Sequence, residues 1–341
     1  MARTPVAARD HPGDRTMTLG AALAAGRTGN LDLLRLMLAA SVVISHAWPL
    51  ALGPGTPEPL AGLTGHALGG WAVALFFFLS GLLITASAER RRAGQFWKAR
   101  ILRIFPGLGV ALLVTLTLAL ASGSMPGLAE ALTWFIRALT LVSIEHRLSG
   151  AFAANPYAGV VNGPLWSLFH EVAAYGVCFL FVALGGTRRP RAVLGVIAGA
   201  ALSVSLAAYL PARAATFAPL FLAFAMGMAA HVWRDRLVLR PVMAVVALPL
   251  IVVLPWGLAV AVLAYACLSV ALCAPERALS ADLSYGVYIY GWPVAQTIVH
   301  LHPGLDPLAL AATSLAATVP FAVFSWYAVE RPALARRWAR V

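Results

Sequence analysis

Long runs of apolar residues, separated by short polar segments, recur along almost the whole chain. A helix that crosses a bilayer needs about 20 mostly apolar residues, because each residue adds only about 1.5 Å along the axis. Runs of this kind, bounded by glycine, proline or charge, occur at 31–50, 71–88, 104–121, 164–184, 192–210, 214–231, 241–256, 257–274, 283–301 and 308–329. The pattern predicts an all-α integral membrane protein, a single bundle of about ten transmembrane helices.

A further apolar run, at 129–144, does not fit this series. It contains Arg137, and a full crossing would move the arginines of 188–191 and 331–340 to the side opposite the other arginine clusters. We therefore expect an interfacial or re-entrant helix there, within an outer segment of about 122–163.

The composition supports a membrane protein and gives its orientation. Hydrophobic residues make up 61% of the chain and charged residues 11%, too few charges to cover the surface of a soluble domain. A net charge of +12 is compatible with nucleic-acid binding, but the arginines form short clusters between apolar runs, as the positive-inside rule requires. Of the 25 lysines and arginines, only Arg137, Arg147 and Arg213 fall in the predicted outer segments. This distribution predicts a multi-pass protein of the inner (plasma) membrane with both termini cytoplasmic, and no nucleic-acid partner.

The ends of the chain differ from its middle. Residues 1–29 are basic and lack the apolar core of a signal peptide, so we expect a disordered cytoplasmic leader. The membrane domain covers 30–330, and 331–341 form a basic cytoplasmic tail. The three cysteines lie in apolar runs without CxxC spacing, which indicates buried small side chains and no metal site. The pattern indicates no particular oligomeric state.

Ionisable residues inside membrane helices are costly and usually functional. In the first span, Arg35 and His46 lie eleven residues apart, which places them on one helix face about 16–17 Å apart along the axis. Asp32 is one turn before Arg35 and can pair with it. His46 falls in the outer half of the span and is a candidate general base. The alternative is a buried histidine that hydrogen-bonds to a neighbouring helix.

The fourth span carries a polar stripe of Ser167, Glu171 and Tyr175 at intervals of four residues. Glu171 belongs to the outer half, as His46 does, so we expect Glu171 to orient or charge the imidazole. A structural link between helices is the alternative. His170 points away from this stripe and is not expected to take part.

The predicted cytoplasmic hairpin at 89–106 is rich in cations. Lys98, Arg100 and Arg103 follow an arginine run, and the two arginines lie one turn apart on the same face. Such a pair suits a phosphate or pyrophosphate. Membrane topology and attraction to anionic membrane lipid explain the preceding run equally well.

The ninth span presents an aromatic stripe of Tyr285, Tyr288 and Trp292. By itself this stripe is more typical of helix packing than of a site.

Together these segments resemble the acyltransferase 3 family of integral membrane proteins. The segments that carry the resemblance, in chain order, are Leu31–Arg35 with His46, Phe76–Gly81, Arg100–Pro106, Leu165–Leu168 with Glu171 and Tyr175, Ser284–Tyr288 followed by Trp292 and Pro293, and Glu330–Pro332. The chain departs from the family at Gly291, where many members carry a histidine.

The resemblance implies an O-acyltransferase that moves an acyl group, often acetyl, to a sugar or related acceptor of the cell envelope, as in polysaccharide modification. It implies that Arg35 and His46 are catalytic, and that Arg100 and Arg103, with Lys98 nearby, bind the donor. His46 then either deprotonates the acceptor hydroxyl as a general base or carries the acyl group transiently, and the sequence does not separate these two routes. The implied donor is an acyl-coenzyme A, with acetyl-coenzyme A as the expected form.

The acceptor, a glycan or a small molecule, is expected on the outer side, because His46 and Glu171 both belong to the outer half. Its expected contacts are Trp166, Ser167, Tyr175, Tyr285 and Tyr288. We expect His46→Ala and Glu171→Gln each to abolish transfer. The competing interpretation is a proton-coupled transporter or exporter, which also uses intramembrane Arg, His and Glu.

Overall fold

The computed structural model describes residues 17–26, 28–141 and 147–336. Within these residues the chain is almost entirely helical. One short ladder joins β1 (Met17–Thr18) to β2 (Val238–Leu239), antiparallel and with Met17 opposite Leu239.

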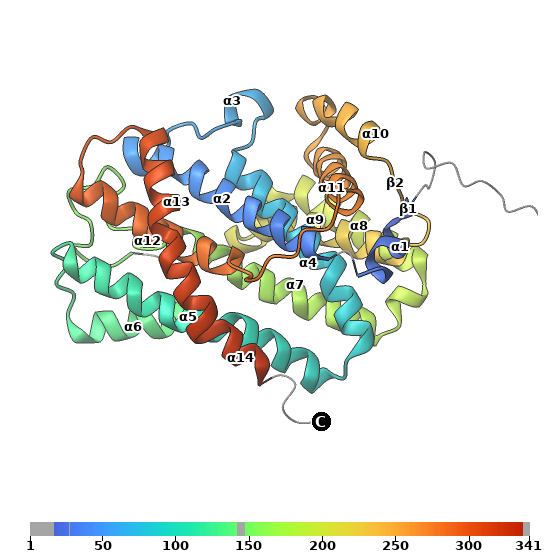
Figure 1. The fold of residues 1–341 in the computed structure, drawn as a ribbon, viewed down its shortest axis with the longest axis horizontal. Helices are drawn as coiled ribbons and strands as arrows, with labels where there is room; N and C mark the ends of the chain where they lie inside the picture. Colours follow the sequence, from blue (N-terminus) through green and yellow to red (C-terminus); the bar gives the residue numbers. More distant parts are fainter. Residues whose placement is uncertain (1–16, 27, 142–146, 337–341) are drawn as a thin grey trace, which may run out of the picture.

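Eight helices of 18 residues or more form the bundle seen in Figure 1. They are α2 (Gly29–Leu52), α4 (Leu68–Arg90), α5 (Ala93–Ala121), α7 (Trp166–Ala183), α9 (Ala212–Val232), α11 (Trp256–Cys273), α12 (Ser284–Leu301) and α13 (Pro307–Phe324). Shorter α-helices are α1 (Leu19–Ala24), α3 (Ala61–Thr64), α6 (Leu128–Leu139), α8 (Pro190–Ser205), α10 (Pro241–Val246) and α14 (Arg331–Ala335). The 3-10 turns η1 (Gly163–Leu165), η2 (Gly186–Arg188), η3 (Ala207–Tyr209) and η4 (Leu248–Val252), and the π-helical η5 (Ser325–Glu330), complete the described chain.

Local sequence explains where these helices begin and end. Helix α2 ends at Gly53, whose φ of 103° lies in the region that glycine adopts without steric cost. Asp306 caps α13, since its carboxylate accepts hydrogen bonds from the N–H groups of Leu308 and Ala309. Pro307 then occupies the first helical position.

Helices α4 and α9 pack most closely, at two glycines. A Cβ at Gly81 would lie 2.0 Å from the carbonyl oxygen of Phe224, and a Cβ at Gly227 would lie 2.0 Å from that of Phe78. Neither position tolerates a side chain. Small residues are the usual means of close helix contact in membranes, where lipid removes the hydrophobic drive between helices.

Seven of the described helical segments are long and apolar enough to cross a membrane. They confirm a multi-pass, all-α membrane protein. Two of the ten predicted spans are shorter than expected: 192–210 becomes the 16-residue α8, and 241–256 becomes the segment Pro241–Val252. The span predicted at 283–301 forms α12 but carries Gln296 and His300, and is not among the seven. The count of ten remains a prediction.

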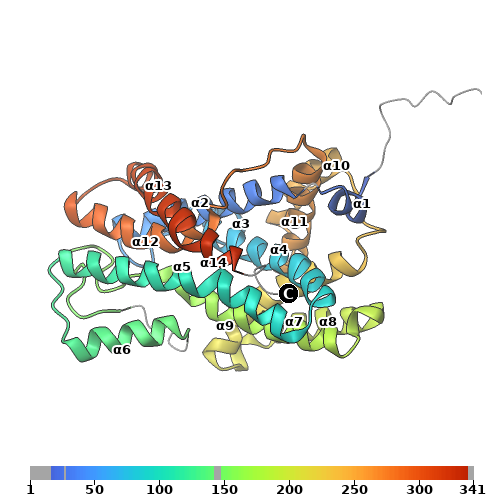
Figure 2. The same ribbon diagram turned by 60° about the horizontal axis from the view of Figure 1, so that its bottom comes forward.

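Helix α6 has the form expected of a re-entrant segment. Its 12 residues extend about 18 Å, well short of the roughly 30 Å hydrocarbon core. It runs back beside α5 (Figures 1 and 2), and Leu139 at its end reaches Gly109 near the middle of α5.

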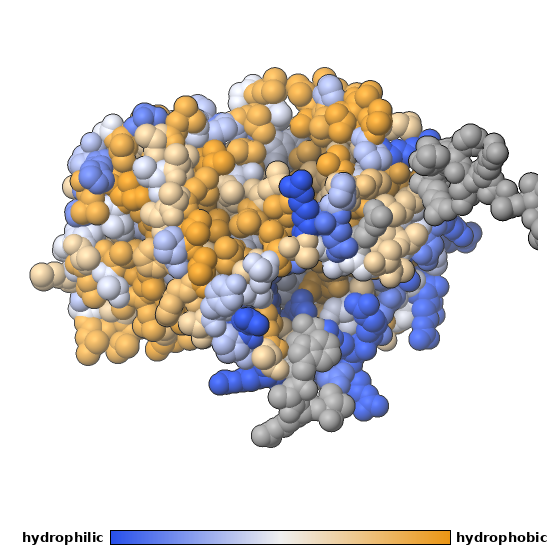
Figure 3. Space-filling view, viewed as in Figure 1, coloured by the Kyte–Doolittle hydropathy of each residue, from blue (hydrophilic) through white to orange (hydrophobic). Residues whose placement is uncertain are grey.

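The bundle has two distinct ends. We call the end that holds residues 89–103, 233–240, 275–283 and 331–336 the arginine end; the opposite end holds 53–67 and 147–165. A hydrogen bond joins distant segments at each end of the bundle. Glu89 accepts from His231 at the arginine end, and Asn155 donates to Gln296 at the opposite end. In Figure 3, apolar residues cover most of the visible face, while hydrophilic residues gather at its lower right, near α14 and the junction of α4 with α5.

The predicted disordered leader is wrong in part. Residues 17–24 form β1 and α1, because Leu19 and Ala22 are fully buried against the bundle and β1 pairs with β2. Residues 1–16 lie outside the described part of the chain, as do residues 337–341 of the predicted tail.

Candidate active site

A cavity of about 400 Å³ opens between α2, α4, α5, α7 and α12, toward the arginine end. Its apolar lining includes Val73, Phe76 and Leu168. Its polar lining comprises Asp32, Arg35, Ser80, Arg100, Arg103, Ser167, Glu171, Tyr175, Asp282, Ser284, Tyr285 and Tyr288. The cavity therefore gathers charged groups from four separate segments, α2, α5, α7 and the connection between α11 and α12, into one space.

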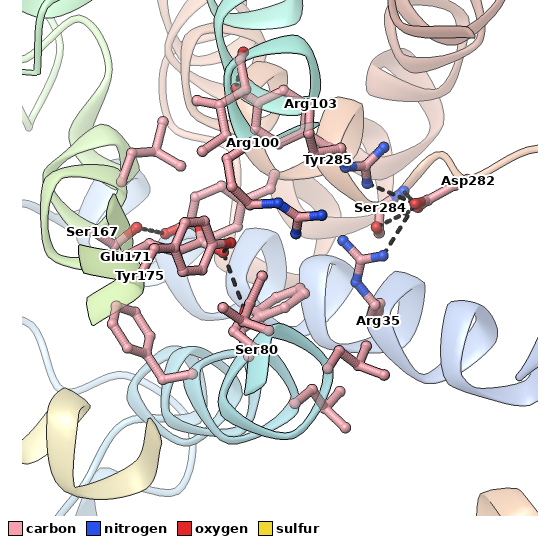
Figure 4. A pocket seen from close by; sticks show the side chains of 18 of the residues that line it. Arg35, Ser80, Arg100, Arg103, Ser167, Glu171, Tyr175, Asp282, Ser284 and Tyr285 are labelled. Atoms are coloured by element: carbon pink, nitrogen blue, oxygen red, sulfur yellow. Dashed lines mark hydrogen bonds and ion pairs between the residues drawn. The ribbon is translucent and has the colours of Figure 1, made fainter. Parts of the chain in front are cut away.

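Two arginines share one carboxylate at the mouth of this cavity. Oδ2 of Asp282 accepts from Arg103 Nη2 at 2.6 Å and from Arg35 Nη1 at 3.1 Å (Figure 4). The predicted pairing of Arg35 with Asp32 is present but longer, at 3.8 Å. Burial raises the pKa of Asp282, but Arg103, Arg35 and the hydrogen bonds from Ser284 outweigh burial and lower that pKa to about 2. Asp282 is thus ionised at any physiological pH.

Arg100 stands apart from these pairs. Its guanidinium carbon lies 5.9 Å from the centre of the Tyr175 ring, and its buried Nε has no hydrogen-bond partner among the described residues. Tyr175 and Ser80 both donate to Oε1 of Glu171, Ser80 at 3.2 Å. Arg100 is therefore the cavity arginine whose hydrogen-bonding capacity is least used.

The aromatic stripe of α12 contributes hydroxyl groups to the cavity, beyond the packing role that its spacing suggests. The Tyr288 hydroxyl lies 2.6 Å from Oγ of Ser167, and the Tyr285 hydroxyl donates to the carbonyl of Ile104 at 2.8 Å. The Arg103 guanidinium lies over the Tyr285 ring at 5.7 Å.

Two of the predicted binding residues do not line the cavity. Lys98 is exposed on α5, and the ring of Trp166 packs edge-on against that of His170, 5.3 Å between centres. His170 is buried, and its ring nitrogens hydrogen-bond to the carbonyl of Trp166 and to the hydroxyl of Thr216. It does not line the cavity, as expected for a residue outside the site.

His46 lies at the opposite end and does not line the cavity. Its Nδ1 is 4.0 Å from Oε2 of Glu58, and its ring packs edge-on against Trp292 at 5.1 Å. Glu58 also accepts from Ser45, whose oxygen in turn accepts from the N–H of Gly69 at 2.8 Å. Burial raises the pKa of Glu58, and the Ser45 hydrogen bond offsets this only in part.

The predicted pairing of Glu171 with His46 is therefore wrong. Glu171 lies one and a half turns inside α7 and faces the cavity, where Ser80 and Tyr175 satisfy it, whereas the carboxylate beside His46 comes from the segment between α2 and α4. Helical depth placed both residues in the outer half, but it could not show which direction each side chain faces.

Helices α2 and α12 nevertheless each carry residues of both the cavity and the surroundings of His46. Tyr288 lines the cavity, and Trp292, one turn further along α12, contacts the His46 ring. One turn corresponds to about 5–6 Å. Arg35 and His46 are eleven residues apart on one face of α2, so the arginine group and the imidazole lie along the same side of this helix.

Sequence reasoning missed Glu58 and Asp282, which lie in connecting segments. A search for ionisable residues inside apolar runs excludes such positions. The one sequence signal for Glu58 was an acidic residue in a segment expected on the same side of the membrane as His46. The one signal for Asp282 was an acidic residue two positions before Ser284. No group of three His, Cys, Asp or Glu side chains suited to a metal occurs in the described ranges.

Comparisons with known proteins agree with this arrangement. Residues 28–327 match the family described as "Acyltransferase domain". The chain is 30% identical over 361 aligned residues to nodulation protein 10 of Rhizobium leguminosarum bv. viciae, covering 93% of this chain and 96% of the relative. It is 29% identical over 343 residues to an O-acetyl transferase of Shigella phage Sf6, covering 89% and 96%. No solved structure matches the chain.

The family match covers most of the chain and includes both polar regions, and it favours an enzyme over the transporter considered as an alternative. The chain belongs to the acyltransferase 3 family and is a membrane O-acyltransferase.

Proposed function

We propose that this protein transfers an acetyl group from cytosolic acetyl-coenzyme A to a hydroxyl group of a cell-envelope glycan. The name of the phage relative, an O-acetyl transferase, supports the acetyl group. The positive-inside rule supports a cytoplasmic arginine end, ten passes, both termini in the cytoplasm and residence in the inner membrane.

The donor binds from the arginine end. Coenzyme A carries several phosphate charges, and guanidinium groups bind phosphate through paired, charge-assisted hydrogen bonds. Arg100, Arg103 and Arg35 line one cavity. The positive-inside rule supports a cytoplasmic arginine end, which is the side where the donor is made. The phosphates bind there while the pantetheine arm follows α2 and α12 toward His46.

His46 carries the chemistry at the other end of this path. Because Nδ1 faces Glu58, Nε2 is the atom left to accept the proton of the acceptor hydroxyl. The hydroxyl oxygen then bonds to the thioester carbon, the carbon–sulfur bond breaks, and the proton passes from the imidazolium to the departing thiolate. Glu58 stabilises the imidazolium and holds the ring in position.

The observation that carries the proposal is that α2 and α12 each contribute to both regions. Three arginines line the cavity together with Tyr288, and Trp292, one turn after Tyr288 on α12, packs against His46, whose Nδ1 is 4.0 Å from Oε2 of Glu58. A path from a phosphate site on one side to a general base near the other suits a two-substrate transfer across a membrane.

The test is release of coenzyme A thiol from acetyl-coenzyme A by the purified protein in nanodiscs. We expect slow turnover, lowered on the order of 10²–10⁴-fold in His46→Ala, because general base catalysis contributes about this much. His302→Ala is the matched control, since His302 is exposed at the opposite end. Equal turnover in wild type and His46→Ala would contradict the proposal.

A further inference from the structure

The charges that line the cavity nearly cancel. Three arginines, Arg35, Arg100 and Arg103, face three carboxylates, Asp32, Glu171 and Asp282. Glu330 adds a carboxylate 3.5 Å from Arg103. A polyanionic donor gains little from cations that are already neutralised, because its phosphates meet the carboxylates as well. Some of these pairs must open before phosphate binds.

Asp282 holds the largest share of the arginine hydrogen bonds. Its Oδ2 bonds to Arg103 and Arg35, and its Oδ1 accepts from the Ser284 hydroxyl at 2.6 Å and from the Ser284 N–H at 3.3 Å. In Figure 4 the carboxylate lies between the two guanidinium groups, while Arg100 projects separately into the cavity. Asp282 belongs to the connection between α11 and α12, whereas both arginines are fixed on helices.

We propose that Asp282 is an internal substitute for a phosphate group of the donor. In the empty enzyme it holds Arg103 and Arg35 in their binding arrangement, and it yields both to a phosphate of acyl-coenzyme A. This inference rests on the proposed function. Asp282 is a positioning residue, because it acts through the two arginines and touches neither the thioester nor the acceptor.

The exchange has a consequence for turnover. Only the fraction of molecules in which Asp282 has released the arginines binds donor fully, so the apparent affinity is lowered by that fraction. The product, coenzyme A, carries the same phosphates as the donor. A carboxylate that returns to the arginines therefore speeds departure of the product.

Asp282→Asn separates the charge from the structural role. Asparagine can still accept from Ser284, because the side chains of aspartate and asparagine both accept from the backbone N–H two residues on. It no longer offers an anion to Arg103 and Arg35. Asp306→Asn is the matched control, because Asp306 caps α13 at the opposite end and does not line the cavity.

The experiment is calorimetric titration of coenzyme A, which lacks an acyl group to transfer, into the full-length protein in nanodiscs. We expect Asp282→Asn to bind about tenfold more tightly than wild type, and Asp306→Asn to bind as wild type does. Coenzyme A should also raise the melting temperature of Asp282→Asn more than that of wild type. If Asp282→Asn does not yield folded protein, Asp282→Ser gives the same comparison, because a serine hydroxyl makes the same kind of turn more weakly and carries no charge.

Unchanged or weaker binding by the folded variant would overturn the role of Asp282. This failure differs from failure of the proposed function. If wild type binds coenzyme A and Arg100→Ala binds it about tenfold more weakly, the donor site stands and the Asp282 inference alone is lost. If wild type and Arg100→Ala bind equally weakly, the donor site itself is wrong.

Discussion

The cavity at the arginine end and the surroundings of His46 hold their charges in different ways. In the cavity, Arg35 and Arg103 share one carboxylate, and Arg100 remains outside any ion pair among the described residues. At the opposite end, a single imidazole lies 4.0 Å from Glu58 and is packed against Trp292. One region can bind a multiply charged group, and the other can move a single proton.

The two tasks of the transferase, phosphate binding and proton transfer, are therefore assigned to different ends of one bundle. Phosphate binding needs several cations, which are tolerable only near a membrane surface and with counter-ions. Proton transfer needs one group with its ordinary pKa near neutrality, and this group can sit among apolar side chains. Changes at the two ends should therefore alter different kinetic parameters.

Among changes at the two ends, Glu58→Gln should have the largest effect. Without the carboxylate, the imidazolium loses its counter-charge, so thiol release should fall on the order of 10²-fold with little change in KM for the donor. Glu130→Gln is the control, because Glu130 lies in α6 and accepts from the Ser149 N–H without contacting His46. A change confined to KM would place Glu58 with donor binding instead.

The same variant has a signature in pH. Burial raises the pKa of Glu58 above its ordinary value, so the carboxylate becomes protonated, and activity is lost, as pH falls through that raised value. Activity is retained above it. The pH profile of kcat/KM should show a limb from Glu58 in wild type, whereas Glu58→Gln should keep only the limb that comes from protonation of His46.

A smaller effect, on binding alone, is expected from Arg100→Ala. Loss of one charge-assisted hydrogen bond to phosphate should raise KM for acetyl-coenzyme A about tenfold and leave kcat nearly unchanged. Lys98→Ala, two residues earlier and exposed, should leave both parameters as in wild type. An equal effect of the two substitutions would indicate general surface charge rather than a built site.

The smallest effect is expected from Glu171→Gln. Because Glu171 accepts from Tyr175 and Ser80 inside the cavity and does not pair with His46, we expect KM to rise about threefold rather than transfer to be abolished. Tyr175→Phe removes one of the same hydrogen bonds and should behave similarly. Complete loss of kcat in Glu171→Gln would contradict this expectation and would indicate that Glu171 supports His46 in catalysis, as the sequence suggested.

Hydropathy and helical spacing predicted much of the fold. They gave the long helices, a separate short helix at α6 and the shared face of Arg35 and His46, because these follow from local residue patterns. They did not give the carboxylate partners. Glu58 and Asp282 reach their partners from connecting segments, and the path of such a segment depends on tertiary packing rather than on periodicity.

The leader shows the same limit. Its composition indicated disorder, yet Leu19 and Ala22 are buried and β1 pairs with a strand more than 200 residues away. A long-range contact of this kind has no signal in the local pattern.

We propose that the donor enters at the arginine end and reacts at His46. Thiol release from sealed membrane vesicles of opposite orientation tests both steps. Acetyl-coenzyme A does not cross the bilayer. We expect thiol release when it is added to vesicles with the cytoplasmic face outward, none with intact vesicles of the reverse orientation, and none above background in His46→Ala. Equal release from both intact preparations would contradict the account.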